Sequence, residues 1–376
     1  MRPGKALRAG ATGTGGPAAT GGGAPAATGG GGPAVTGGGG PAVTGGGGPA
    51  VTGRGGPWPG RDVGTLVERL RAGDRRAVAR LISLVEDGAR EQLREVAEAL
   101  NPSTGRAMVL GLTGSPGVGK STLANALVTA YRAAGSAVGV LAVDPSSPFT
   151  GGALLGDRVR MQHHALDQGV YIRSMATRGH LGGLAWATPQ AVRVLDAAGC
   201  EVVLVETVGV GQAEVEVAGL ADTTLVVLAP GFGDAVQVAK AGILEVADVF
   251  VVNKADKDGA DTVARDLRQM LHLGAARPWQ VPVVRTVAER RSGIDELVEQ
   301  VAAHRAHLEA GGELAERRRR RAAREIEELA LADLREELGE LGRGEALDKL
   351  AEQVAAGDLG PYTAAEQLLA RARGEA

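Results

Sequence analysis

The stretch that decides the fold is GLTGSPGVGKSTL, residues 111–123. It joins an apolar run to an Ala- and Leu-rich run, so it predicts a strand, a glycine-rich turn and a helix. Gly114, Gly119, Lys120 and Ser121 match the pattern G-x-x-x-x-G-K-[ST] without a gap. Glycines allow successive backbone N–H groups to point inward at an anion, and the lysine adds a positive charge. We therefore predict a loop that binds nucleotide phosphates; a glycine-rich turn with a chance lysine is the alternative.

We expect this loop, called the phosphate loop below, and the first turn of the next helix to contact the nucleotide. Lys120 is expected to contact the β- and γ-phosphates, and the Ser121 hydroxyl to bind Mg²⁺. The helix, predicted from Ser121 to about Ala134, directs its positive N-terminal dipole at the same anion. The predicted phosphate-binding residues are Gly114, Ser115, Pro116, Gly117, Val118, Gly119, Lys120, Ser121 and Thr122.

Apolar strands alternate with helical stretches over residues 105–308. Most of the strand candidates are continuous apolar runs, as in a parallel sheet covered on both faces. The sequence predicts an α/β fold of the P-loop NTPase type: a doubly wound, mostly parallel sheet with N- and C-terminal helical extensions. The predicted strands are Ala107–Thr113, Val138–Val143, Val202–Glu206, Thr224–Leu228, Val249–Asn253 and Val281–Arg285.

Three segments flank the predicted nucleotide domain. Residues 1–60 repeat Gly, Pro, Ala and Thr, with prolines every eight residues from Pro17 to Pro57, and predict a disordered tail or a tether. Residues 61–104 carry apolar residues at helical spacing and predict about three short helices. Residues 309–376 predict a charged helical arm with an apolar stripe, suited to dimerisation or to docking on the main domain.

Carboxylates that end predicted strands are candidates for a metal site. Asp144 and Glu206 fall at the carboxyl ends of two strands, where ligands of such sheets bind. Asp157 follows on a loop, and hard oxygen ligands near a triphosphate are what Mg²⁺ prefers. We predict Ser121, Asp144, Asp157 and Glu206 around Mg²⁺, with the Gly209 N–H at the γ-phosphate.

The stretch VVNKADKD, residues 251–258, selects the base. Asp256 offers two acceptor oxygens, and guanine presents two donors on one edge, whereas adenine has no such pair. A carboxylate facing adenine would lose both hydrogen bonds, at a cost of about 1–3 kcal/mol each. Asn253 is expected to bond the other edge of the base, and the Lys254 stem to cover the ring face. The sequence therefore predicts guanine rather than adenine.

Composition limits the function classes. The 41 basic and 44 acidic residues give a net charge of −3, so nothing draws the whole chain to nucleic acid or to an anionic membrane. The Arg317–Arg321 run is followed by glutamates and is interpreted as part of a solvated helix. Cys200, the single cysteine, is expected to be buried. Without a long apolar run or a signal-peptide pattern, we expect a cytoplasmic protein that does not enter a membrane.

Several quoted stretches, taken together and in this order, resemble the MeaB/ArgK family of P-loop GTPases. They are GSPGVGKST, AVDPSSP, TRGHLGG, VETVGVGQAEVEV, GDAVQVAKAGILEVADVFVVNKAD and SGIDEL. The usual D-x-x-G is replaced by Glu206-Thr-Val-Gly209, a narrow marker of that family, which also includes the human relative known as MMAA. Where the family usually shows Ser-Ala, this chain has Val287-Ala288, whose Ala288 N–H is expected to face guanine O6.

The resemblance implies a homodimeric GTPase that uses GTP/GDP and Mg²⁺. Such proteins act as chaperones of an adenosylcobalamin-dependent mutase, with methylmalonyl-CoA mutase as the expected client. They gate cofactor loading and protect or reactivate the mutase. The resemblance also implies switch segments at residues 157–161 and 233–240. The expected partner-sensing residues are Arg158, Arg160, Asp234, Gln237 and Lys240.

Hydrolysis requires a positioned water and compensation of developing charge. Lys120 and Gly209 are the predicted catalytic contacts, and Gln212 is the candidate near the water because Val210 is apolar. We therefore expect slow hydrolysis that the mutase stimulates. Two alternatives stay open: a GTPase that matures nickel enzymes, and a kinase linked to arginine transport. Nickel GTPases usually carry Cys/His clusters near the loop, and a kinase needs an acceptor site; the sequence displays neither.

Overall fold

The computed structural model describes residues 62–144, 164, 166–176, 187–207, 213–232, 243–274, 277–342 and 345–372. The chain divides into two units, Met1–Gly56 and Pro57–Ala376, and all described residues belong to the second. The predicted repeat tail, residues 1–60, lies outside the described residues.

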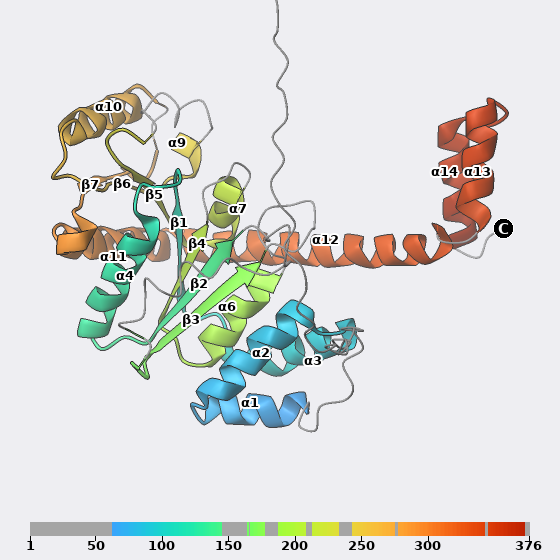
Figure 1. Ribbon diagram of the computed structural model, residues 1–376, viewed down its shortest axis with the longest axis horizontal. Helices are drawn as coiled ribbons and strands as arrows, with labels where there is room; N and C mark the ends of the chain where they lie inside the picture. Colours follow the sequence, from blue (N-terminus) through green and yellow to red (C-terminus); the bar gives the residue numbers. More distant parts are fainter. Residues whose placement is uncertain are drawn as a thin grey trace, which may run out of the picture. The chain divides into compact units, whose positions relative to one another are not determined.

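A parallel sheet of seven strands forms the centre of this unit (Figure 1). Its order is β3-β2-β4-β1-β5-β6-β7, so β1 lies in the middle and all neighbours pair in parallel. This arrangement confirms the predicted α/β class. The strands are β1 (Met108–Thr113), β2 (Val138–Asp144), β3 (Val170–Ala176), β4 (Val202–Thr207), β5 (Thr223–Leu228), β6 (Val249–Val252) and β7 (Val283–Arg285).

β3 was not predicted, and three strands are shorter at one end than predicted, β1 by the single residue Ala107. β3 lies at one edge of the sheet and contains Arg173 and Ser174, so it lacks the continuous apolar run that marks its neighbours. The predicted strand at Val281 begins only at Val283, because Pro282 has no backbone N–H for the ladder. Asn253 follows β6 rather than ending it.

Helices cover both faces of the sheet. α4 and α11 share one apolar core with the central strands, whereas α6 and α1–α3 share the core on the other face (Figure 1). α10 covers β5 and β6 in a third, smaller cluster. The helices up to this point are α1 (Val63–Arg71), α2 (Arg75–Asp87), α3 (Arg90–Leu100), α4 (Lys120–Ala133), α6 (Ala187–Ala197), α7 (Ala213–Leu220), α9 (Ile243–Val246), α10 (Ala260–Leu273) and α11 (Ile294–Ala310).

Three helices, α1–α3, fill the N-terminal segment for which the sequence predicts about three, and short turns at Gly73-Asp74 and Gly88-Ala89 separate them. Gly73 has a φ of 81°, which ends α1, and Asp74 then caps α2 by accepting from the Arg76 N–H at 2.8 Å. Asp62 caps α1 in the same way, accepting from the Gly64 N–H at 3.1 Å. These helices bury their apolar faces against α6, so they support the side of the sheet opposite α4.

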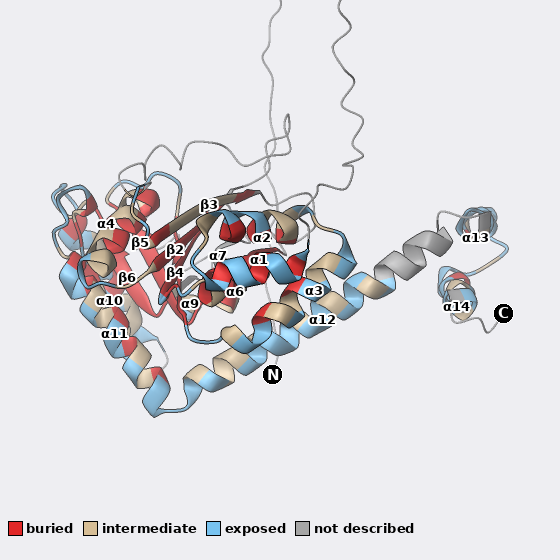
Figure 2. Cartoon of the chain, turned by 90° about the horizontal axis from the view of Figure 1, so that it is seen from below, coloured by how far each residue is buried: buried red, intermediate tan, exposed pale blue. Residues whose placement is uncertain are grey.

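Three helices follow α11: α12 (Glu313–Gly342), α13 (Glu345–Ala356) and α14 (Pro361–Ala372). No described side chain of α12 is fully buried (Figure 2). Among its described apolar side chains, Ile326 is 67% and Leu334 54% exposed, and Leu329 is partly buried. These side chains therefore do not form a buried contact that docks α12 on the sheet.

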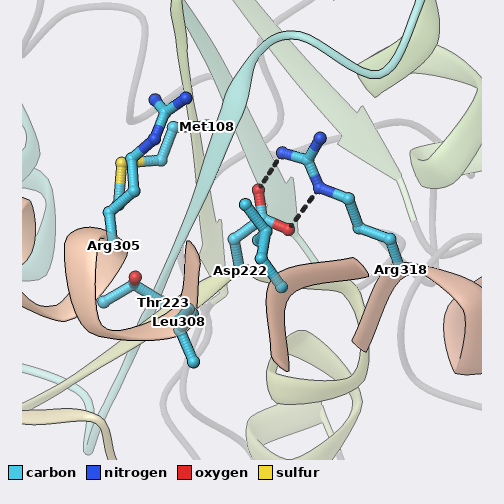
Figure 3. A pocket seen from close by; sticks show the side chains of 7 residues that line it. Met108, Asp222, Thr223, Arg305, Leu308 and Arg318 are labelled. Carbon is cyan, nitrogen blue, oxygen red and sulfur yellow. Dashed lines mark hydrogen bonds and ion pairs between the residues drawn. The ribbon is translucent and has the colours of Figure 1, made fainter. Parts of the chain in front are cut away.

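Three arginines dock α12 instead, which corrects part of the interpretation of Arg317–Arg321 as a solvated run: Arg317, Arg318 and Arg321 pair with buried aspartates, whereas Arg319 and Arg320 stay exposed. Arg318 donates through Nε and Nη2 to the two oxygens of Asp222, at 3.3 and 2.9 Å (Figure 3). Arg321 donates to the same carboxylate at 2.8 Å, and Arg317 donates to both oxygens of Asp248. Asp222 and Asp248 are buried and stand directly before β5 and β6.

These aspartates also accept hydrogen bonds from backbone N–H groups of the sheet. Asp222 accepts from the Val109 N–H at 3.0 Å, and Asp248 accepts from the Thr224 N–H at 2.8 Å. Burial alone would raise the pKa of each carboxyl, but the arginines, and His304 beside Asp248, lower both pKa values below the ordinary one. α12 is thus anchored at the amino ends of β5 and β6, whereas the phosphate loop lies at the carboxyl end of β1.

In the part of the chain that the structure describes, no helix combines the length and apolar character needed to cross a membrane.

Candidate functional site

The phosphate loop connects the end of β1 to the start of α4, as predicted, although α4 begins one residue earlier, at Lys120. Gly114, Gly117 and Gly119 have φ values of 141°, 83° and 96°, which side-chain-bearing residues rarely adopt. A Cβ at Gly114 would collide with the carbonyl oxygen of Val227 on β5. The glycine spacing in the sequence therefore follows from the path of this loop.

Lys120 lies inside the loop. Its Nζ donates to the carbonyl oxygens of Gly114 at 2.6 Å and Ser115 at 3.2 Å, and the residue is only 6% exposed. The ammonium is therefore surrounded by the glycine-rich turn at the positive end of α4, a position suited to an anion.

Ser121 and Glu206, two of the four predicted Mg²⁺ ligands, lie in contact. The Ser121 Oγ donates to Glu206 Oε1 at 2.6 Å, across 85 residues of sequence, and both residues are buried. Parallel pairing of β1 with β4 brings them together, because Leu112 and Glu206 are register partners. A hydroxyl beside a carboxylate is a donor set that fits Mg²⁺.

Asn253 joins the phosphate loop to the predicted base-binding segment, residues 253–256. Its Nδ2 donates to the Val118 carbonyl at 2.9 Å, which bridges 135 residues of sequence. Its Oδ1 accepts from Thr286 Oγ1 and from the Ala288 N–H, both at 3.1 Å. The Ala288 N–H, expected to face guanine O6, thus has a protein acceptor here, and its contact with the base stays a prediction.

Lys254 also contacts the phosphate loop. Its Nζ donates to the Gly117 carbonyl at 2.7 Å and lies 4.1 Å from the centroid of the Phe232 ring. Its own φ is 54°, the left-handed region that a lysine rarely occupies. Asp256 is one-third exposed and lies 3.7 Å from Arg290 Nη2. Asn253 and Lys254 therefore lie against the phosphate loop, and Asp256 follows two residues later in the chain.

Sequence reasoning missed three residues of this neighbourhood: Phe232, Thr286 and Arg290. Phe232 is one of the chain's three phenylalanines and lies in the loop that follows β5, so an aromatic residue there, in a chain with few aromatics, was a usable signal. Thr286 and Arg290 flank Val287-Ala288 and carried no motif of their own.

Several predicted site residues fall outside the described part of the chain. Asp144 ends β2, at the same edge of the sheet as the phosphate loop, but its side chain is not described. The others that fall outside the described residues are Asp157, Arg158, Arg160, Gly209, Gln212, Asp234, Gln237 and Lys240.

A family model described as methylmalonyl Co-A mutase-associated GTPase MeaB matches residues 78–341, well over half of the chain. The chain belongs to this family. The resemblance drawn from the quoted motifs is thereby confirmed, and the family boundaries include the phosphate loop, the base-binding segment and most of α12.

Individual relatives cover most of the chain. A Pyrococcus abyssi protein that carries the GTPase name is 50% identical over 312 residues, 82% of this chain and 96% of its own length. The Escherichia coli protein named GTPase ArgK is 37% identical, over 80% of this chain and 94% of its own. The mouse protein named methylmalonic aciduria type A homolog, mitochondrial, is 35% identical, over 69% of this chain and 66% of its own.

A solved structure named LAO/AO transport system kinase is similar in fold. Its TM-score is 0.61 at 28% identity, and the match covers 83% of this chain and 98% of the other. Because that match spans nearly all of the other protein, the two chains share a fold over most of their length.

Proposed function

We propose that this chain binds GTP and hydrolyses it to GDP and phosphate. The observation that carries the proposal is the contact between two distant motifs: Asn253 donates to Val118 and Lys254 donates to Gly117. In this arrangement the loop can bind the phosphates of a guanine nucleotide while the neighbouring N-K-x-D segment binds its base. The GTPase name of the family and of its relatives supports the same activity.

Each residue of the site has a proposed role. Lys120 and the loop amides hold the phosphates, Asn253, Lys254 and Asp256 select guanine, and Val287-Ala288 borders the base. Ser121 and Glu206 bind Mg²⁺ together with Asp144 and Asp157, and the ion would offset charge on the phosphates. Gly209 contacts the γ-phosphate, and Gln212 is the candidate that orients the attacking water.

We further propose that the GTPase acts on an adenosylcobalamin-dependent acyl-CoA mutase, with methylmalonyl-CoA mutase as the first client to test. The name of the family supports this client. In this proposal the protein is a cytoplasmic homodimer, built through α12–α14, and residues 157–161 and 233–240 respond to the mutase. Neither the nickel-enzyme nor the kinase alternative gains support from a contact among the described residues.

The experiment is a GTP turnover assay with and without purified methylmalonyl-CoA mutase, with labelled GTP to trace the phosphate. We expect slow release of inorganic phosphate from the protein alone and a rate at least about tenfold higher with the mutase, as partner-supplied order raises such rates. Equal rates would contradict the client, whereas label transferred to an acceptor instead of water would contradict the GTPase itself.

A further inference from the structure

We infer that Phe232 is a positioning residue of the nucleotide site: its ring fixes the Lys254 ammonium against the Gly117 carbonyl and thereby slows the release of guanine nucleotide. The inference rests on the proposed function, because it assigns a role in holding the nucleotide that the site is proposed to bind.

The loop after β5 brings Phe232 to the site. β5 ends at Leu228, and the Phe232 N–H donates to the Ala229 carbonyl at 3.2 Å, which closes a turn. Gly231 in that turn has a φ of 77°. Phe232 is a large apolar side chain that remains 42% exposed, so the turn holds it at the surface beside the loop.

The ring has two neighbours, Lys254 and Gly117, which also bond to each other. The Lys254 Nζ lies 4.1 Å from the ring centroid and donates to the Gly117 carbonyl at 2.7 Å. A Cβ at Gly117 would lie only 2.8 Å from Phe232 Cε1, so the ring lies directly against the phosphate loop. Phe232 therefore contacts both motifs that are proposed to hold the nucleotide, the one for phosphate and the one for base.

The geometry favours a role through Lys254. An ammonium at this distance from a ring is attracted by the negative π face, and the attraction is stronger where water is partly excluded. Lys254 also occupies a left-handed backbone conformation, so its side chain starts from a constrained position. Without the ring, the ammonium would keep one acceptor, Gly117, and the lysine stem proposed to cover guanine would be less well fixed.

The alternative is that Phe232 merely covers Gly117 as a surface side chain. In that case its removal would change thermal stability but not the rate of nucleotide release. A second alternative is that the ring competes with the nucleotide, and then its removal would tighten binding. The three readings predict different results for the same variants.

The test measures release of fluorescent GDP by stopped flow for wild type, F232A, F232L and F232Y, with melting temperatures of the nucleotide-free proteins. We expect release to be about threefold to tenfold faster in F232A and F232L and near wild type in F232Y, which retains the ring. L273A, at a residue that is 76% exposed on α10, is the control and should release GDP at the wild-type rate.

A double-mutant cycle with K254A shows whether Phe232 acts through the lysine. F232A should have little further effect on GDP release when Lys254 is already alanine, because coupled residues are not additive. If wild type fails to bind GDP, the proposed function fails and the inference fails with it. If wild type binds GDP but F232A releases it within twofold of the wild-type rate, or more slowly, or adds its full effect to K254A, the inference alone is overturned.

Discussion

Gly119 is the residue at which the phosphate loop and the base-binding segment meet. Its φ of 96° starts α4, and a Cβ there would lie 2.5 Å from Asn253 Nδ2. We predict that G119A weakens GTP binding about tenfold, the equivalent of one lost hydrogen bond of about 1.4 kcal/mol, because the methyl group displaces Asn253 from Val118. Isothermal titration calorimetry measures this directly.

Gly135 provides a matched control for that substitution. It has nearly the same φ, 90°, but a Cβ there would meet nothing within 4 Å. G135A should therefore cost only the backbone strain of a left-handed alanine, about 1–2 kcal/mol of stability, and leave GTP affinity unchanged. Equal losses of GTP affinity in the two variants would contradict the proposed contact between loop and base segment.

Glu206 allows the proposed metal site to be separated from the nucleotide site. E206Q keeps the shape of the side chain next to Ser121 but removes the negative charge. We predict that Mg²⁺-dependent GTP affinity falls about tenfold or more, because a proposed Mg²⁺ ligand loses its charge, whereas GDP affinity in EDTA stays at the wild-type value. A parallel loss in EDTA would mean that Glu206 supports the loop rather than the ion.

At the scale of the element, α12 is held by charge rather than by its apolar stripe. R318A removes one of the two arginines that pair with Asp222, whose side chain is 2% exposed. We predict a loss of about 2 kcal/mol of unfolding free energy, less than the roughly 3–5 kcal/mol typical of an orphaned buried charge, because Arg321 remains. Urea unfolding measures the loss.

The same helix supplies the control. Arg320 is two residues away but pairs with Glu316 at the surface, where ion pairs contribute little. R320A should leave the urea midpoint unchanged within error. Equal unfolding free energies of R318A and R320A would contradict the claim that arginines hold α12 on the sheet.

The elements show which parts of the fold were predictable. Continuous apolar runs identified six of the strands, Gly73 with the capping Asp74 identified the break between α1 and α2, and Gly88 identified the end of α2. β3 was missed because an edge strand needs no apolar run. The docking arginines were missed because local charge balance cannot distinguish a solvated arginine from one that meets a distant buried aspartate. The repeated Ala-Asp directly before β5 and β6 was the available signal.

For the whole molecule, the buried aspartates predict how stability depends on pH. Asp222 and Asp248 have pKa values below the ordinary 3.8, despite burial, because arginines and His304 favour their charged forms. The unfolded chain therefore takes up these protons at higher pH than the folded chain does. The stabilisation is fully present above the ordinary pKa and is lost as the pH falls through the folded-state values.

We accordingly predict that the stability difference between wild type and the variants D222N and D248N shrinks as the pH falls from 6 towards 3. Urea unfolding at a series of pH values, at constant ionic strength, gives that difference. A difference that stays constant, or grows on acidification, would contradict the account of these ion pairs.

At the same scale, the sequence predicted which distant segments lie together, but not which atoms within them form contacts. The meeting of residues 114–121 with residues 253–256 follows from strand order, because β1, β5 and β6 are neighbours and end at one edge. The contact that each side chain makes does not follow from the strand order. Ala288 donates to Asn253, and Lys254 meets Phe232, because side-chain packing at the edge decides such contacts.

The most direct test of the central claim is calorimetric titration of wild type and D256N with GTP and with ATP, each with Mg²⁺. The account predicts that wild type binds GTP at least about a hundredfold more tightly than ATP, and that D256N loses most of that ratio while its ATP affinity is unchanged. Comparable affinities of wild type for GTP and ATP, or a ratio that survives in D256N, would contradict it.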